Sequence, residues 1–378
     1  NNPVQGDPIP MFHFLERNFP SGYLSVPSVG AGTANTEFEC ISAMNLDFFG
    51  PGEYPYKTIL QKTACESMAF DMKNLGYKAH AVHNNEATFY DRHKVFAQLG
   101  FDTFTPIEYM YDIERNPTGW CKDKVLVGEI EKVLDSSIGS DFVYTISVQG
   151  HGKYPSFEYY CEQIHEMDEF VGQLINMLNT RMEPTVLVLY GDHLPGFEWT
   201  AQEMENESLF QTKYVVWNNV NLPAVKRNVE AYQLAAHVLN MLDIHEGTML
   251  RFHQRHLDAW DTDTQSYLDA MKLLQYDILY GDHEVYGGES PYQATQLEFG
   301  VTPIIQGTTV HNTDQVIVFG GPFNSWSKIC VNGKAADTQY YSKTRLIAKG
   351  VEPKEKEEIT VQQVGRDKIH LGTARKKQ

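Results

Sequence analysis

An aspartate and a histidine stand side by side directly after an apolar run, at residues 192 and 193. The run at 185–190 (Thr-Val-Leu-Val-Leu-Tyr) predicts a buried strand, and Gly191 lets the backbone turn where it ends. In open α/β sheets, functional residues gather at the carboxyl ends of the strands, because helices cover both faces. The carboxylate of Asp192 and the imidazole of His193 are ligands that suit Mn²⁺ or Zn²⁺. The alternative is an ordinary turn, in which Asp192 caps the backbone and His193 is solvated.

Two further histidines follow predicted strands. His83 comes after the strand at 77–82, and His151 comes after the strand at 142–148. Any one of these histidines alone is more commonly a turn residue. Three strand ends that carry His, His and Asp-His together predict an enzyme rather than a binding protein.

A nucleophile is predicted near the start of the chain. The flexible stretch at 30–32 (Gly-Ala-Gly) leads to Thr33, just before a predicted helix that begins at Ala34. A hydroxyl at a helix N-terminus lies in a positive field that favours an incoming phosphate, and metal coordination can lower its pKa. Thr36 and Glu39 have the Thr-x-x-Glu spacing of a capping box. We therefore assign the cap to Thr36 and the chemistry to Thr33.

The composition is that of a globular protein, and it argues against several classes of protein. The 378 residues are 42% hydrophobic and carry a net charge of −18, which argues against nucleic-acid binding. No apolar run reaches the ~18 residues that span a bilayer, and the first residues do not resemble a signal peptide. The cysteines are too sparse for a zinc knuckle or a disulfide scaffold; they are Cys40, Cys65, Cys121, Cys161 and Cys330.

Alternating helix and strand patterns predict an α/β fold with a mostly parallel sheet and helices on both faces. The predicted helices are 57–76, 123–137, 158–180 and 229–243, and the predicted strands are 77–82, 142–148, 185–190 and 214–217.

The pattern changes near 289–300, which reads as a linker. We predict two domains, a catalytic domain at 1–290 and a small immunoglobulin-like β-sandwich at 301–378. Its predicted strands are 315–319, 328–331, 344–348 and 358–364. Asn332-Gly333 predicts a hairpin turn. This domain lacks a cluster of catalytic residue types, so a spacer or docking role is expected.

Four motifs in order along residues 5–290 carry a specific resemblance. They are Gly-x-Gly-Thr-Ala-Asn-x-Glu-Phe-Glu around Thr33, His-x₆-Tyr-x-Arg from His83 to Arg92, Gln-Gly-His-Gly around His151 and Tyr-Gly-Asp-His ending at His193. This pattern resembles the extracellular domain of lipoteichoic acid synthases, glycerol-phosphate transferases in the sulfatase-like branch of the alkaline phosphatase superfamily. The resemblance implies an α/β sandwich of that type and a single Mn²⁺, with Mg²⁺ or Zn²⁺ as alternatives.

The resemblance also implies a role for each motif residue. Thr33 would be the nucleophile and would hold the metal with Asp192 and His193. The implied substrate contacts are His83, Tyr90, Arg92 and His151. The chemistry agrees, because the planar fork of arginine suits a phosphate and histidine suits general acid or base catalysis. In the expected reaction, Thr33 takes phosphoglycerol from a lipid and passes it to a polyol end or to water.

The partners implied are an anionic glycerophospholipid donor and a polyol-phosphate acceptor. The resemblance places the reaction at the extracellular face of a bacterial cell membrane, with attachment through N-terminal helices that this sequence does not include. A phosphodiesterase or phosphatase of the same superfamily is an alternative. A sulfatase is less favoured, because no cysteine lies in a Cys-x-Pro-x-Arg motif. A catalytically dead module that binds envelope glycopolymers is the alternative from another class.

Two features depart from the resemblance. Tyr90 replaces a tryptophan of the best-known members. Their metal-binding glutamate, on the first strand of the sheet, has no counterpart before Thr33, and Glu16 lies in a helical pattern. We therefore expect the sheet to lack one strand and the metal to bind weakly. Finally, Tyr-Gly-Asp-His recurs at 280–283 after a helical pattern, which predicts a surface turn.

Overall fold

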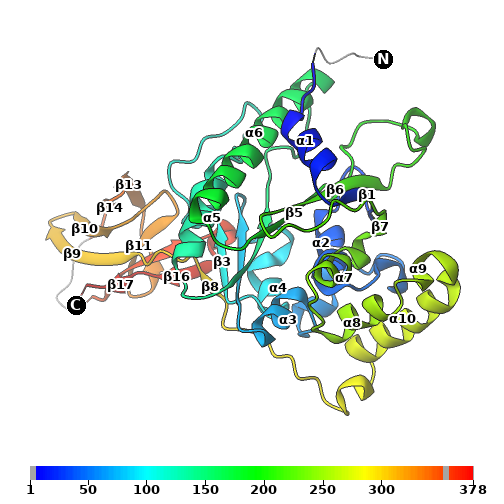
Figure 1. Cartoon of the computed structure of the whole chain (residues 1–378). Coiled ribbons are helices and arrows are strands. Elements are labelled where there is room, and N and C mark those ends of the chain that lie inside the picture. The colour runs from blue at the N-terminus through cyan, green and yellow to red at the C-terminus, as the bar shows by residue number, and fades with distance from the viewer. Residues whose placement is uncertain (1–5, 352–356, 378) are drawn as a thin grey trace.

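The computed structural model describes residues 6–351 and 357–377, and its strands form four sheets (Figure 1). Two of these sheets lie in the part of the chain that holds the site motifs, and the other two are built mainly from residues after 300. None of the helices in the described ranges is both long and apolar enough to cross a membrane.

One sheet is fully parallel and has the order β4-β2-β3-β8. Its strands are β2 (Lys78–His83), β3 (Thr103–Pro106), β4 (Asp141–Ile146) and β8 (Glu298–Phe299). The register pairs His83 with both Pro106 and Ile146, so the carboxyl ends of three strands meet at one edge. The predicted α/β class and parallel sheet are confirmed here. Part of the predicted linker forms β8, the outermost strand.

The second sheet has the order β5-β6-β1-β7 and is mixed. Its strands are β1 (Ser21–Ser25), β5 (Val186–Tyr190), β6 (Gln211–Asn218) and β7 (Val229–Glu230). Strand β6 runs antiparallel to both β5 and β1. The expectation of a mostly parallel arrangement therefore does not extend to this sheet. Strand β1 was not predicted, because its Ser-Gly-Tyr-Leu-Ser sequence has little apolar signal.

Strands β4 and β5 each lie at the edge of their sheet, with one paired neighbour among the described residues. Their apolar side chains are mostly half-buried rather than buried. Across this boundary the hydroxyls of Tyr144 and Tyr190 are hydrogen-bonded to each other. The missing strand with its acidic ligand remains a prediction. Strand β1 precedes Thr33 but ends in Ser25, and Glu16 binds Lys213 of β6 instead.

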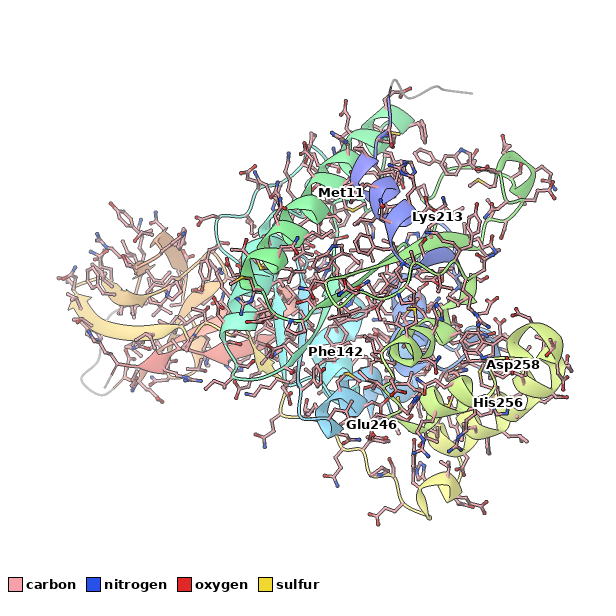
Figure 2. All side chains as sticks on the ribbon, viewed as in Figure 1. Met11, Phe142, Lys213, Glu246, His256 and Asp258 are labelled. Carbon is pink, nitrogen blue, oxygen red and sulfur yellow. The ribbon has the colours of Figure 1, made fainter. Side chains whose placement is uncertain are left out.

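The helices of the catalytic part pack around these sheets. They are α1 (Pro10–Asn18), α2 (Thr33–Ser42), α3 (Met68–Asn74), α4 (Arg92–Gln98), α5 (Val125–Asp135), α6 (Phe157–Arg181), α7 (Ala231–Met241), α8 (Thr248–Arg255), α9 (Ala259–Thr262) and α10 (Thr264–Leu279). Figure 2 labels Met11 where α1 lies beside α6, and Asp168 of α6 accepts hydrogen bonds from the Met11 and Phe12 amides at 2.7 and 2.8 Å.

The helix predicted at 57–76 is wrong over its first half. Two 3₁₀ turns, Pro55–Lys57 and Ile59–Gln61, occupy that stretch, and α3 begins only at Met68. Thr58 between the turns has a non-helical backbone, and Ser67 accepts a hydrogen bond from the Phe70 amide as the N-cap of α3. The local cap therefore sets the start of this helix.

The C-terminal part contains two mostly antiparallel sheets, with orders β13-β14-β10-β9-β17 and β12-β11-β15-β16. The strands are β9 (Ile305–Asn312), β10 (Gln315–Gly321), β11 (Ser327–Val331), β12 (Lys334–Ala335), β13 (Thr338–Ser342), β14 (Arg345–Lys349), β15 (Ile359–Val364), β16 (His370–Thr373) and β17 (Arg375–Lys376). The predicted hairpin is confirmed, since Asn332 and Gly333 have φ of 49° and 79° between β11 and β12.

This part packs against the parallel sheet through buried polar contacts. Asn324 donates to the Glu108 carbonyl at 2.8 Å, and Tyr111 donates to the Pro322 carbonyl at 2.9 Å. The buried amide of Gln363 also donates to the Glu108 carbonyl. The immunoglobulin-like topology and the division at 290–301 remain predictions.

Alanine substitutions at two glycines test how tightly β1 and α5 are packed. A Cβ on Gly22 in β1 would lie 1.8 Å from the Arg227 carbonyl oxygen, whereas a Cβ on Gly128 in α5 would contact nothing within 4 Å. Gly22→Ala should therefore lower the free energy of unfolding by about 1–3 kcal/mol through overpacking. Gly128→Ala should raise it by about 0.5–1 kcal/mol. Urea denaturation measures both, and equal midpoints would contradict the packing of β1 against the Arg227 segment.

Candidate active site

Asp192 and His193 follow β5 and point their ligand atoms toward each other. The Nδ1 of His193 lies 2.8 Å from the Leu194 carbonyl and donates to it, which leaves Nε2 unprotonated in the neutral ring. That Nε2 lies 3.5 Å from Oδ2 of Asp192, whose Oδ1 accepts from the His193 amide at 3.0 Å. One oxygen and one nitrogen therefore converge at the predicted place.

Thr33 is the first residue of α2, one position earlier in the helix than expected. Gly32, with φ of 103°, is the N-cap, and within the described residues the Thr33 hydroxyl has no hydrogen-bond partner. The Gly30 amide donates to the Leu194 carbonyl at 3.0 Å, and Thr36 donates to the Asp192 carbonyl at 2.6 Å. The structure thus brings the start of α2 against the Asp192-His193 turn.

The predicted capping box at Thr36 and Glu39 is wrong. Thr36 lies inside α2 and uses its hydroxyl on Asp192, while Glu39 accepts a hydrogen bond from the Leu46 amide at 2.8 Å. The four-residue pattern is too short to reveal that the helix already begins at Thr33. Thr36 therefore connects α2 to the Asp192-His193 turn.

The segment before Thr33 and the loop after His193 approach each other so closely that glycine is required at Gly30. A Cβ on Gly30 would lie 3.2 Å from the Gly196 Cα, and Gly30 also has φ of +73°. The Gly-rich approach to Thr33 therefore serves packing against the loop after His193.

His83 ends β2 and is 2% exposed. Its Nδ1 donates to the Ile146 carbonyl of β4 at 2.8 Å, and its buried Nε2 has no partner. Burial, and then the charge of Arg92, hold the pKa of His83 well below its usual range. The ring is therefore neutral, and Nε2 is an acceptor available to a ligand.

Arg92 lies at the start of α4, is 1% exposed, and is bound by Glu37 of α2. Its Nε lies 3.1 and 3.2 Å from the two carboxylate oxygens, and Nη2 also contacts Oε1. Tyr56 donates to the same carboxylate at 3.1 Å. Burial opposes the charge of Arg92, but Glu37 outweighs it and the pKa of Arg92 is raised. The predicted phosphate contact remains a prediction, since Glu37 already engages most of the fork.

The ring of His151 packs against aromatic side chains, a contact that the sequence did not predict. Its ring centroid is 4.5 Å from that of Trp120 and 6.0 Å from that of Phe89, which contacts Tyr90. The Nδ1 of His151 donates to the Gly152 carbonyl at 2.7 Å, so Nε2 is the free nitrogen. Tyr90 has φ of 56° and its ring lies 5.2 Å from the Arg92 guanidinium. Trp120 was missed because it belongs to none of the four motifs.

A buried aspartate behind His151 was also missed. Oδ1 of Asp123 accepts from the amides of Val148 and Gln149, each at 3.1 Å, and from the side chain of Asn84 at 2.8 Å. Burial raises the pKa of Asp123 to about 6. This carboxylate ties together the segments that follow β2 and β4 and so positions His83 and His151. A lone Asp in a loop gives no sequence signal for this role.

The metal-ligand set is small. Across residues 6–351 and 357–377, no group of three or more His, Cys, Asp or Glu side chains could hold a metal ion. The donor chemistry of Asp192 and His193 fits a divalent cation, and Thr33 is a candidate third donor at the start of α2, which packs against their turn.

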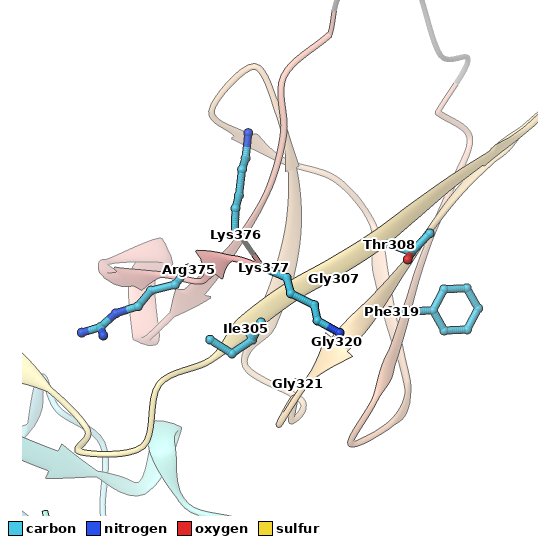
Figure 3. Close-up of a pocket in the computed structure, with 9 residues that line it drawn as sticks. All are labelled: Ile305, Gly307, Thr308, Phe319, Gly320, Gly321, Arg375, Lys376 and Lys377. Carbon is cyan, nitrogen blue, oxygen red and sulfur yellow. The ribbon is translucent and has the colours of Figure 1, made fainter.

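Other candidate groups lie outside this site. The second Tyr-Gly-Asp-His string follows α10 and precedes the short 3₁₀ turn Glu284–Tyr286, which confirms the predicted turn. All five cysteines are buried and unpaired. A groove of about 780 Å³ on the C-terminal sheets (Figure 3) is lined by β9, β10 and the basic end of the chain, without a carboxylate or imidazole.

Comparison with known proteins decides the family. The family model described as Sulfatase matches residues 3–244, well over half of the chain. The chain belongs to the sulfatase family. It is 26% identical over 259 residues to a putative cyclic β-1,2-glucan modification protein of Rhizobium meliloti, which covers 59% of this chain and 39% of that relative. The chain therefore spans about two fifths of that relative's length.

Solved structures share the fold. The phosphoglycerol transferase GacH of Streptococcus pyogenes, in complex with sn-glycerol-1-phosphate, aligns with a TM-score of 0.65 at 19% identity and covers 77% of this chain and 84% of its own. The lipoteichoic acid synthase LtaP of Listeria monocytogenes aligns with a TM-score of 0.53 at 18% identity, covering 65% and 68%. The expected alkaline phosphatase and sulfatase type of fold is confirmed.

The Glu37–Arg92 pair allows a stability test. Glu37→Gln leaves the buried Arg92 charge uncompensated and should cost about 3–5 kcal/mol of unfolding free energy. Arg92→Lys should also destabilise, because an ammonium group cannot reproduce the fork. The exposed pair of Lys57 and Asp91 is the control, and Lys57→Ala should cost at most about 1 kcal/mol. Urea unfolding of the three variants is the measurement; similar losses for Glu37→Gln and Lys57→Ala would refute the role of the buried pair.

Proposed function

We propose that this protein transfers phosphoglycerol from a lipid donor to an acceptor hydroxyl through a covalent intermediate on Thr33, with a divalent cation. The observation that carries the proposal is the packing of the Thr33 end of α2 against the Asp192-His193 turn. The fold shared with GacH and LtaP supports it.

In the first step, the Thr33 oxygen attacks the phosphorus and the bond from phosphorus to the lipid alcohol oxygen breaks. The threonine proton goes to a base, and the leaving alcohol takes up a proton. The first amides of α2 face the phosphate oxygens with the positive end of the helix dipole. In the second step, an acceptor hydroxyl attacks the same phosphorus and releases Thr33.

Two histidine rings offer nitrogens for these proton transfers. The Nε2 atoms of His83 and His151 are both free, because Nδ1 of each ring donates to a backbone carbonyl. We assign His151 the proton of the leaving or attacking oxygen, and His83, Tyr90 and Arg92 the binding of glycerol phosphate.

Asp192, His193 and Thr33 would hold the cation, for which we propose Mn²⁺, with Mg²⁺ or Zn²⁺ as alternatives. Such an ion supplies positive charge to the phosphate and lowers the pKa of a bound hydroxyl. We propose the extracellular face of a bacterial membrane as the place of the reaction, since the donor is a lipid.

The acceptor we propose is a glycan hydroxyl. The relative named for cyclic β-1,2-glucan modification supports a carbohydrate acceptor. Water as acceptor would make the protein a phosphodiesterase, and the same site residues would serve both reactions. Products formed with and without glycan distinguish them.

Thr33→Ala should abolish both turnover and the covalent adduct. Intact-protein mass spectrometry after incubation with phosphatidylglycerol measures the adduct, and release of diacylglycerol measures turnover. Thr36→Ser is the matched control on α2, because it keeps the hydroxyl that binds the Asp192 carbonyl. A normal adduct on the Thr33→Ala protein would overturn the mechanism.

Mn²⁺ affinity tests the ligand pair. With Asp192, His193 and Thr33 as the protein donors, calorimetric titration should show weak binding. Asp192→Asn should weaken it by more than about tenfold, since even outer-sphere changes cost roughly 10–100-fold. Asp282→Asn, in the repeated Tyr-Gly-Asp-His string, should leave the affinity unchanged. Equal loss in both variants would exclude Asp192 as a specific ligand.

A further inference from the structure

Five aromatic side chains form a cluster beside the site, which we call the aromatic platform. Its members are Tyr154, Phe157, Tyr160, Phe197 and Trp199. Phe197 is at its centre, stacked on Tyr154 at 5.0 Å between centroids and 4.9 Å from Trp199. Phe157, on the first turn of α6, contacts Trp199 edge-on at 5.9 Å.

The platform is continuous with the Asp192-His193 turn. Phe197 lies four residues after His193, and the Tyr154 hydroxyl donates to the Gly150 carbonyl, next to His151, at 2.8 Å. Burial, and then the nearby Asp192 charge, raise the pKa of Tyr154 to about 12. The rings therefore lie next to the segments that carry His151 and the Asp192-His193 pair.

The five rings of the platform are not part of the hydrophobic core. All five are partly exposed and contact one another, and none belongs to the core clusters formed by the sheets and helices. The segment between β5 and β6 that carries Phe197 and Trp199 projects outward from the body of the molecule (Figure 1). Stacked, partly exposed aromatic residues are typical of ligand-binding surfaces.

The charge around the platform selects against anionic partners. Residues 191–212 contain no Lys or Arg, and their acidic residues are Asp192, Glu198, Glu203, Glu205 and Glu207. On the other side of the platform, residues 150–162 contain one lysine, Lys153, and two acids, Glu158 and Glu162. An anionic membrane or polymer would be repelled by such a surface. A neutral glycan avoids this repulsion, and the C–H faces of its sugar rings can pack on aromatic faces.

We propose that the aromatic platform binds the sugar rings of a neutral glycan acceptor and delivers one of its hydroxyls to the phosphoryl group on Thr33. This inference rests on the proposed transferase function, and it assigns the acceptor to a defined surface. Trp199, which contacts only Phe157 and Phe197 within the cluster, would supply the stacking face, and the acidic loop would disfavour charged competitors.

Binding of a neutral β-glucan oligosaccharide, measured by calorimetry on the full chain, tests the platform. Trp199→Ala should weaken binding roughly tenfold, the effect of one lost stacking contact, and Trp199→Phe should recover part of it. Tyr276→Ala, at an exposed aromatic on α10, is the control and should bind like the unmodified protein. Thermal melts confirm that the variants are folded. Equal glucan binding by the unmodified and Trp199→Ala proteins would overturn the proposal.

Two further measurements separate the alternatives. Anionic vesicles of phosphatidylglycerol should bind the unmodified and Trp199→Ala proteins equally, and a selective loss of vesicle binding would identify the platform as a membrane contact instead. The Thr33 adduct is scored separately. If glucan binds through Trp199 but no adduct forms, the transferase function fails and the glycan site stands. If the adduct forms without glucan binding, the platform proposal fails.

Discussion

The buried ion pair between Glu37 and Arg92 holds the site together. It joins α2, which begins at the proposed nucleophile Thr33, to α4 and the segment that follows His83. A pair removed from water in this way is stable only when its geometry is good and its remaining oxygens are satisfied, as Tyr56 does here. The positions of the proposed nucleophile Thr33 and of His83 thus depend in part on one contact between two helices.

Further hydrogen bonds, most of them to the backbone, fix the same elements. The Gly30 and Leu194 contact and the Thr36 and Asp192 contact fix α2 against the end of β5. On the other side, Asp123 fixes the segments that follow β2 and β4. The segments that carry the candidate residues are therefore tied to one another by contacts between different strands and helices, as preorganised sites require.

The sequence predicted those features that local pattern encodes. The strand before His83, the strand before Asp192, the long helix α6 and the Asn332-Gly333 turn are confirmed because periodicity and turn chemistry are local. Strand β1, the antiparallel β6 and the pairing of Glu37 with Arg92 depend on contacts between distant segments, and no local signal encodes these. Motif matching named Arg92 as a phosphate ligand but could not show that a carboxylate 55 residues away engages it.

Charge balance supports the proposed cation at this site. The chain carries a net charge of −18, and the charge of Arg92 is already compensated by Glu37. His83 is held neutral by burial and by Arg92, so it adds no positive charge. A phosphodiester, the proposed substrate, would therefore meet Asp192 and an acidic loop, and the N-terminus of α2 beside them would offer a positive field. A helix terminus supplies only about half an elementary charge. A divalent ion held by Asp192, His193 and Thr33 would supply the remaining compensation and reverse the sign of the charge at the proposed phosphate site.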